Sequence, residues 1–110
     1  MIFKIIEIKS DRPIDIDTEI KFSVATARAE NTELLRLDIK KDEESYTKVY
    51  NGAIKVLKKM KSLSHIQFIA TPKSFLDSNA EAEFLINKYP NQMENIPKCD
   101  DGEGYIFVKL

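Results

Sequence analysis

The feature that most constrains the fold is the stretch from Glu43 to Ser62, in which apolar side chains recur every three or four residues. This spacing places one apolar stripe along a helix, formed by Tyr46, Val49, Tyr50, Ala53, Leu57 and Met60. Acidic residues precede the stripe and lysines follow it, as the helix dipole favours. The sequence therefore predicts a long amphipathic helix, and Gly52 within it suggests a close approach to the sheet.

Three short segments are apolar on both alternating faces, which is typical of strands covered on both sides. They are residues 2–8, 65–70 and 105–108. Polar or proline-containing stretches bound them, at Ser10 to Pro13 after the first and at Thr71 and Pro72 after the second. We therefore expect three interior strands.

The segment 19–41 alternates between apolar and polar residues. Ile20, Phe22 and Val24 occupy every second position and would share one face of a strand. After a turn near residues 30–32, Leu35, Leu37 and Ile39 would share one face of a second strand. This pattern predicts a hairpin with one wet face. A helix is the alternative for residues 25–38, because the alanines and glutamates there are good helix formers.

A second helix is predicted from the capping-box pattern Ser78-Asn79-Ala80-Glu81 to Tyr89, and residues 91–104 are predicted as a loop. The order β-β-β-α-β-α-β indicates a single α+β domain over residues 1–110. We expect a two-layer sandwich, in which a mixed sheet of about five strands carries two helices. Two helices cannot cover both faces of such a sheet, so a homodimer is the simplest way to cover the second face.

Composition excludes several classes of function. The 17 basic and 18 acidic residues leave no overall surplus of positive charge, so nucleic acid is an unfavoured partner. One cysteine and one histidine can form neither an intramolecular disulfide nor a His/Cys zinc site. Glu7 and Lys9 interrupt the first apolar run before it reaches the length of a signal peptide core or a membrane span. We therefore expect a cytoplasmic protein without membrane contact.

One triplet could carry chemistry, namely Asp38-Ile39-Lys40 at the end of the second hairpin strand. Strand alternation would turn its carboxylate and its ammonium group to one face. With an upstream acid at Asp15 or Asp17, this triplet resembles the active site of the PD-(D/E)xK nucleases. The resemblance implies Mg²⁺ held by Asp17 and Asp38, with Lys40 positioning the attacking water. The simpler interpretation is a pair of solvated side chains on a wet strand face.

Other charged clusters have equally simple interpretations. The acidic loop Asp100-Asp101-Gly102-Glu103 could in principle bind a hard cation, but it lacks the ligand spacing of an EF-hand. Five lysines, at positions 48, 55, 58, 59 and 61, could form a basic patch for nucleic acid or an acidic protein, and a solvated helix face explains them as well. Cys99 lies beside two aspartates, which disfavour a reactive thiolate.

The absence of nucleotide-binding and hydrolase motifs, together with the predicted excess of apolar strand surface, points to a binding role. We therefore predict a small non-enzymatic module without a cofactor, which acts through protein–protein contacts and self-associates. Ile5, Ile69 and Phe107, on strands whose second face lacks an obvious cover, are the predicted self-association residues. A metal-dependent nuclease is the alternative.

Overall fold

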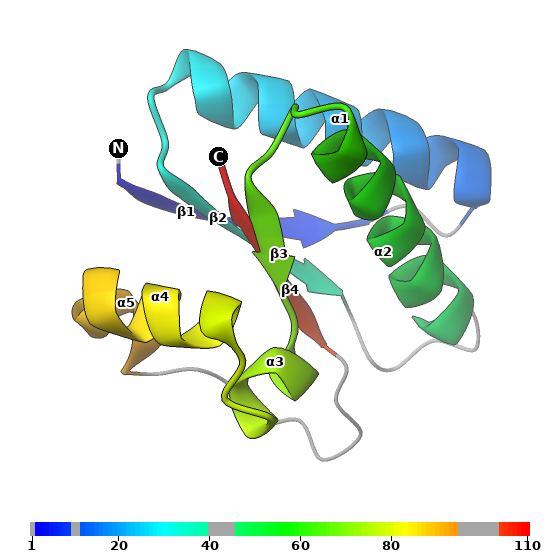
Figure 1. Cartoon of the computed structure of the whole chain (residues 1–110). Helices are drawn as coiled ribbons and strands as arrows, with labels where there is room; N and C mark the ends of the chain where they lie inside the picture. The colour runs from blue at the N-terminus through cyan, green and yellow to red at the C-terminus, as the bar shows by residue number, and fades with distance from the viewer. Residues whose placement is uncertain (1, 10–11, 40–45, 95–103) are drawn as a thin grey trace.

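The computed structural model describes residues 2–9, 12–39, 46–94 and 104–110. Four strands form one mixed sheet in the order β1-β2-β4-β3, with helices on both sides (Figure 1). The α+β class and the mixed sheet predicted from the sequence are therefore confirmed. The described residues form four strands and five helices, where the sequence predicted about five strands and two helices.

The largest correction concerns the predicted hairpin. Its first half, the predicted strand beginning at Glu19, belongs to helix α1 (Pro13–Ala29), while its second half is strand β2 (Leu34–Ile39). Strand β1 (Phe3–Ile8) pairs with β2 in parallel, and parallel neighbours need a crossover between them, which α1 supplies.

The helical assignment has a clear physical basis. Pro13 occupies the first turn, where a missing N–H has no cost. The buried residues of α1 recur at helical spacing, namely Ile16, Ile20, Ser23, Val24 and Ala27. Phe22, which supported the predicted alternation, is instead 71% exposed. One aromatic side chain on the solvent side of a helix had therefore produced a strand-like pattern.

The predicted long helix is confirmed as α2 (Tyr46–Ser62), whose stripe of Val49, Tyr50, Ala53, Leu57 and Met60 is buried. Strand β3 (Phe68–Ala70) follows it and is shorter than the predicted run from His65. The close approach expected at Gly52 is to α1, because a Cβ atom there would lie 3.7 Å from Ile16 Cδ1.

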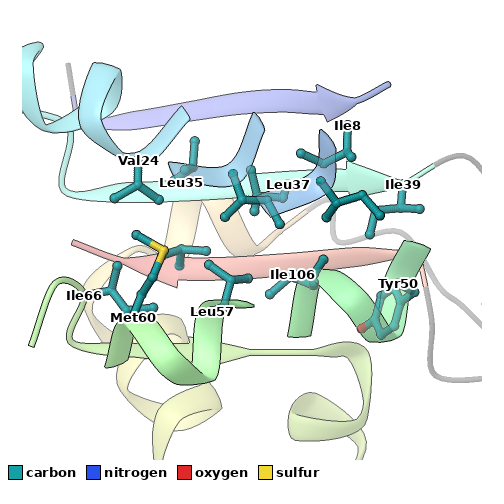
Figure 2. Packing of buried hydrophobic residues seen from close by; sticks show 14 of the residues in the cluster. Ile8, Val24, Leu35, Leu37, Ile39, Tyr50, Leu57, Met60, Ile66 and Ile106 are labelled. Atoms are coloured by element: carbon teal, nitrogen blue, oxygen red, sulfur yellow. The ribbon is translucent and has the colours of Figure 1, made fainter. Parts of the chain in front are cut away.

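Helices α1 and α2 cover the same face of the sheet. Figure 2 shows the largely aliphatic core between these two helices and the sheet, where Val24, Leu57 and Met60 meet Leu37 and Ile106 from the strands. This core is built from two long helices that each present one apolar stripe to the sheet. It matches the packing expected for one layer of helices on a sheet.

Three short helices cover part of the second face: α3 (Pro72–Leu76), α4 (Ala80–Lys88) and α5 (Pro90–Met93). The predicted helix from Ser78 to Tyr89 thus becomes α4, and Asn79 caps it by accepting a hydrogen bond from the Ala82 N–H at 3.0 Å. Leu85, Tyr89 and Met93 from these helices pack against the sheet in a second core. The molecule therefore has three layers rather than two.

Strand β4 (Tyr105–Lys109) is antiparallel to both β2 and β3 and lies between them. It corresponds to the closing strand that the sequence predicted. Its side chains alternate between the two cores, with Ile106 and Val108 in the first and Tyr105 and Phe107 in the second. All five residues of β4 are buried, which confirms the expected interior strand.

Candidate functional site

The second face of the sheet is only partly covered. Its open part is a strip of four side chains on β1 and β2, in which Ile5 pairs with Arg36 and Glu7 pairs with Asp38. The register of β2 with β4 places Arg36 and Asp38 on the same face as Phe107 and Tyr105. Ile5 is 49% exposed within this strip. We call Ile5, Glu7, Arg36 and Asp38 the open strip.

A bidentate ion pair dominates the open strip. Arg36 donates from Nε to Asp38 Oδ1 at 2.8 Å and from Nη2 to Asp38 Oδ2 at 2.9 Å. The two side chains are 15% and 34% exposed, so water screens this pair less than it screens a fully exposed pair. Both carboxylate oxygens of Asp38 are therefore already engaged by a guanidinium group.

Asp17 and Asp38, the predicted metal ligands of the nuclease alternative, lie on different elements. Strand β2 does extend through Asp38, as that interpretation required, and Lys40 lies outside the described residues. Asp17, however, belongs to α1 and accepts a hydrogen bond from Lys21 Nζ at 3.1 Å. Helix α1 covers the face opposite to the one that carries Asp38. The described ranges contain no group of three His, Cys, Asp or Glu residues arranged to hold a metal ion.

The three predicted self-association residues have different environments. Phe107 is fully buried, where it packs at 5.7 Å from the Phe75 ring and at 5.3 Å from the Tyr105 ring. Ile69 is partly buried against the first core. The face expected to need a second copy is thus partly covered by α3, α4 and α5, and of the three residues only Ile5 is substantially exposed.

Ile5 also lies on an edge strand. The Leu34 N–H donates to the Ile2 carbonyl at 3.0 Å, so the even-numbered residues of β1 turn their backbone groups toward β2. The backbone groups of Phe3 and Ile5 then point to the outer edge, which no strand of the described chain occupies. An edge of this kind is a template for pairing with another chain.

Helix α1 borders the same edge. Glu19 accepts the Lys9 N–H at 3.1 Å, and Glu30 pairs with Lys4 Nζ at 2.9 Å, so the two acids hold both ends of β1. Phe22 lies between these acids in the helix and lines a shallow depression with Asp15, Thr18 and Glu19. The ring of Phe22 is exposed on the outer side of α1.

A polar cluster lies where α4 meets the ends of β2 and β4. The Tyr89 hydroxyl donates to Glu33 Oε1 at 3.0 Å, and Lys88 Nζ lies 3.9 Å from the same oxygen. Burial raises the pKa of Tyr89 from 10.0 to about 12, and the hydrogen bond to Glu33 and the charge of that carboxylate add to the shift. Tyr89 therefore keeps its proton at neutral pH and ties α4 to the sheet.

Lys109 is the buried cation of this region. Burial lowers its pKa, and the positive charge of Lys88 lowers it further, while Glu33 acts in the opposite direction. Its Nζ donates to the carbonyl of Leu110 at 3.0 Å. These contacts account for Lys109 as a structural residue of the second face.

Sequence reasoning did not name Glu7, Arg36 or Phe22 as candidate site residues. Arg36 and Asp38 are two apart in a strand, which was a usable signal for an ion pair on one face. The residues around Glu7 did not indicate that it would lie beside Asp38, because the register of β1 with β2 depends on the α1 crossover. The predicted candidates in the acidic loop 100–103 and Cys99 lie outside the described residues.

No family model, curated protein or solved structure is significantly similar to this chain. Among the helices of the described residues, none has the length and apolar character needed to cross a membrane. The geometry of the described surface is therefore the basis for a functional proposal.

Proposed function

We propose that this protein is a non-enzymatic binding module that acts through protein–protein contacts and works as a homodimer paired along β1. The observation that carries the proposal is the outer edge of β1, where Ile5 is half-exposed and the backbone of Phe3 and Ile5 points outward. Main-chain pairing at a sheet edge is a common basis of protein recognition.

The sequence of β1 is complementary to itself in the antiparallel direction. A twofold axis through Ile5 sets Ile5 opposite Ile5 of the partner subunit, and Phe3 opposite Glu7 of the partner subunit. Lys4 then faces Ile6 of the partner subunit, so this register places no like charges opposite each other. Registers centred on Lys4 or on Glu7 pair like charges and are disfavoured.

Pairing along β1 also removes exposed apolar surface. Ile5 of both subunits is covered on the open strip. Burial of apolar surface supplies the driving force, and the added main-chain hydrogen bonds fix the direction of the strands. The sheet of the dimer is then continuous across both subunits.

The test is the molar mass in solution, measured by light scattering on eluted protein. We expect wild type to have twice the chain mass, whereas Ile5→Glu and Ile5→Lys are monomers, because each sets like charges opposite one another. An equimolar mixture of the two variants restores the dimer. Ile86→Lys is the matched control, since Ile86 is 48% exposed on α4, and it remains a dimer.

Two results contradict the proposal. One is a monomeric wild type at all concentrations up to several hundred micromolar. The other is a dimer that survives in both Ile5 variants taken singly, since that dimer would use another surface. Circular dichroism of each variant confirms that a loss of dimer is not a loss of fold.

A second candidate, metal-dependent cleavage of nucleic acid, has one observation in its favour. Glu7 and Asp38 are neighbouring carboxylates on the open strip. Because Arg36 already engages both oxygens of Asp38, we expect no cleavage of single- or double-stranded DNA or RNA with Mg²⁺ or Mn²⁺. Cutting that is lost in both Asp38→Asn and Lys40→Ala would establish the nuclease instead.

A further inference from the structure

The strongest remaining surface feature is the charge of α2. This helix carries five lysines and no acidic residue: Lys48, Lys55, Lys58, Lys59 and Lys61. The whole chain has a net charge of −1, so the positive charge of α2 is offset by acids elsewhere in the sequence. Helices α1 and α4, by contrast, contain residues of both signs. Positive charge is thus concentrated on one element.

The lysines of α2 are exposed, and no acid in the described residues pairs with them. All five are exposed, and Lys48, Lys55, Lys58 and Lys59 lie on the side of the helix opposite the stripe that contains Ala53 and Leu57. None of them forms an ion pair with a residue in the described part of the chain, whereas Lys4, Lys21 and Lys88 each do. The five ammonium groups are therefore available to an external anion.

The arrangement fits an elongated partner rather than a small ion. From Lys48 to Lys61 the helix extends about 20 Å, at about 1.5 Å for each residue. Lys48, Lys55 and Lys59 fall along one row, with Asn51 between the first two. A chain that carries several negative charges along its length matches this row.

The chemistry of the surface favours a polypeptide. Nucleic-acid surfaces rely on arginine forks and on aromatic rings that stack with bases, and the exposed residues of α2 from 47 to 62 include neither. An interfacial membrane helix needs apolar residues beside its cations, and the exposed residues of α2 are polar or charged. Lysine ammonium groups, with flexible stems, suit carboxylates that are spaced irregularly along a peptide.

We infer that the lysine face of α2 docks an acidic polypeptide segment of a partner protein, rich in Asp and Glu. This inference rests on the proposed binding role and names the chemistry of the partner. The surface is separate from the β1 edge, because α2 packs against α1 and over β2 and β3. Each subunit of the dimer therefore offers one such face.

The experiment uses fluorescein-labelled poly-L-glutamate as the probe and follows its anisotropy as full-length protein is added. We expect saturable binding at 50 mM salt that weakens at least tenfold at 300 mM salt, because the contacts are between exposed charges. The variant Lys55→Gln/Lys58→Gln/Lys59→Gln loses at least tenfold in affinity. The control Lys9→Gln/Lys21→Gln/Lys73→Gln removes the same charge elsewhere and stays within twofold of wild type.

Three results overturn the inference: no binding of poly-L-glutamate, equal losses in the two triple variants, or tighter binding to another polyanion. Labelled single-stranded and duplex DNA and vesicles that contain phosphatidylserine supply the last comparison. The outcome is independent of self-association, because Ile5→Glu retains α2 and must still bind the probe. If poly-L-glutamate does not bind, the proposed β1 dimer is unaffected. If the protein proves to be monomeric, the binding expected at α2 is unaffected.

Discussion

The two faces of the sheet are built in different ways. The first face is covered by two long helices and is aliphatic, with Leu35, Leu37, Ile106 and Val108 on the strands. The second is covered by three short helices and is aromatic, with Phe3, Phe68, Phe75, Tyr105 and Phe107 packed together. Helices α1 and α2 cover the first face, whereas the short helices leave the open strip on the second. Polar contacts of functional interest therefore gather on the second face.

Length of helix explains the difference. A helix of four or five turns presents a continuous stripe and covers several strands, whereas α3 and α5 contain only five and four residues. Four of the five rings on the second face belong to the strands, and only Phe75 comes from a short helix. The three short helices leave part of this face uncovered. What they do not reach stays open, including Ile5 and the Arg36–Asp38 ion pair.

The largest expected effect tests whether both faces are essential to stability. Phe107→Ala removes a fully buried ring from the centre of the aromatic core and should cost about 3–5 kcal/mol of unfolding free energy. Leu57→Ala on the first face should cost about 2–5 kcal/mol. Urea denaturation measures both losses.

The control for this pair is Leu76→Ala on α3, a residue that is 73% exposed and should change stability by no more than about 0.5 kcal/mol. A loss below about 1 kcal/mol for Phe107→Ala would mean that α3, α4 and α5 contribute little to the fold, and the comparison of the two faces would fail.

The next prediction concerns how the free energy of unfolding depends on pH through Tyr89, a residue of the second face. The pKa of Tyr89 in the folded protein, about 12, lies above its value of 10.0 in the unfolded chain. Its stabilising contribution is therefore complete below about pH 10 and is lost as the pH rises through about 12. Tyr89→Phe lacks this titratable group. The unfolding free energy of wild type should therefore fall relative to that of Tyr89→Phe as the pH rises from about 10 to about 12.

Ultraviolet absorbance of the phenolate provides a direct check, taken as the difference between the titrations of wild type and Tyr89→Phe. An inflection near pH 10 in folded protein would show that the contact between α4 and Glu33 does not persist in solution.

The smallest effect compares two ion pairs. Double-mutant cycles should give about 1 kcal/mol of coupling for Arg36 with Asp38, because the contact is bidentate and partly buried. The exposed pair of Asp17 with Lys21 on the first-face helix should give only about 0.3 kcal/mol. Equal couplings would mean that the open strip is as fully hydrated as the outside of α1.

Sequence reasoning succeeded where a segment follows one period over several turns or is bounded by clear stop signals. The stripe from Val49 to Met60 and the closing strand at Tyr105 are examples. It failed at α1, where Phe22 mimicked an alternation while Ile16 and Ile20 already marked a helix. A period of two and a period of 3.6 agree by chance over short stretches, and only the full set of buried positions separates them.

The candidate site was harder to predict than the fold. Ile5 and Asp38 were both named from the sequence, but for different roles, and the structure places them on one open strip. Their proximity depends on the register between β1 and β2, which is set by a crossover of 17 residues that had been predicted as a strand in part. A site made by neighbouring strands cannot be located until the connection between them is known.

The position of β4 has a consequence for the synthesis of the protein. This strand follows every other described element in the sequence, yet it lies between β2 and β3 and hydrogen-bonds to both. Until residues 105–109 have been synthesised, the sheet cannot close, and β2 presents an unpaired edge. Insertion of β4 between β2 and β3 is therefore the step that closes the sheet and covers that edge of β2.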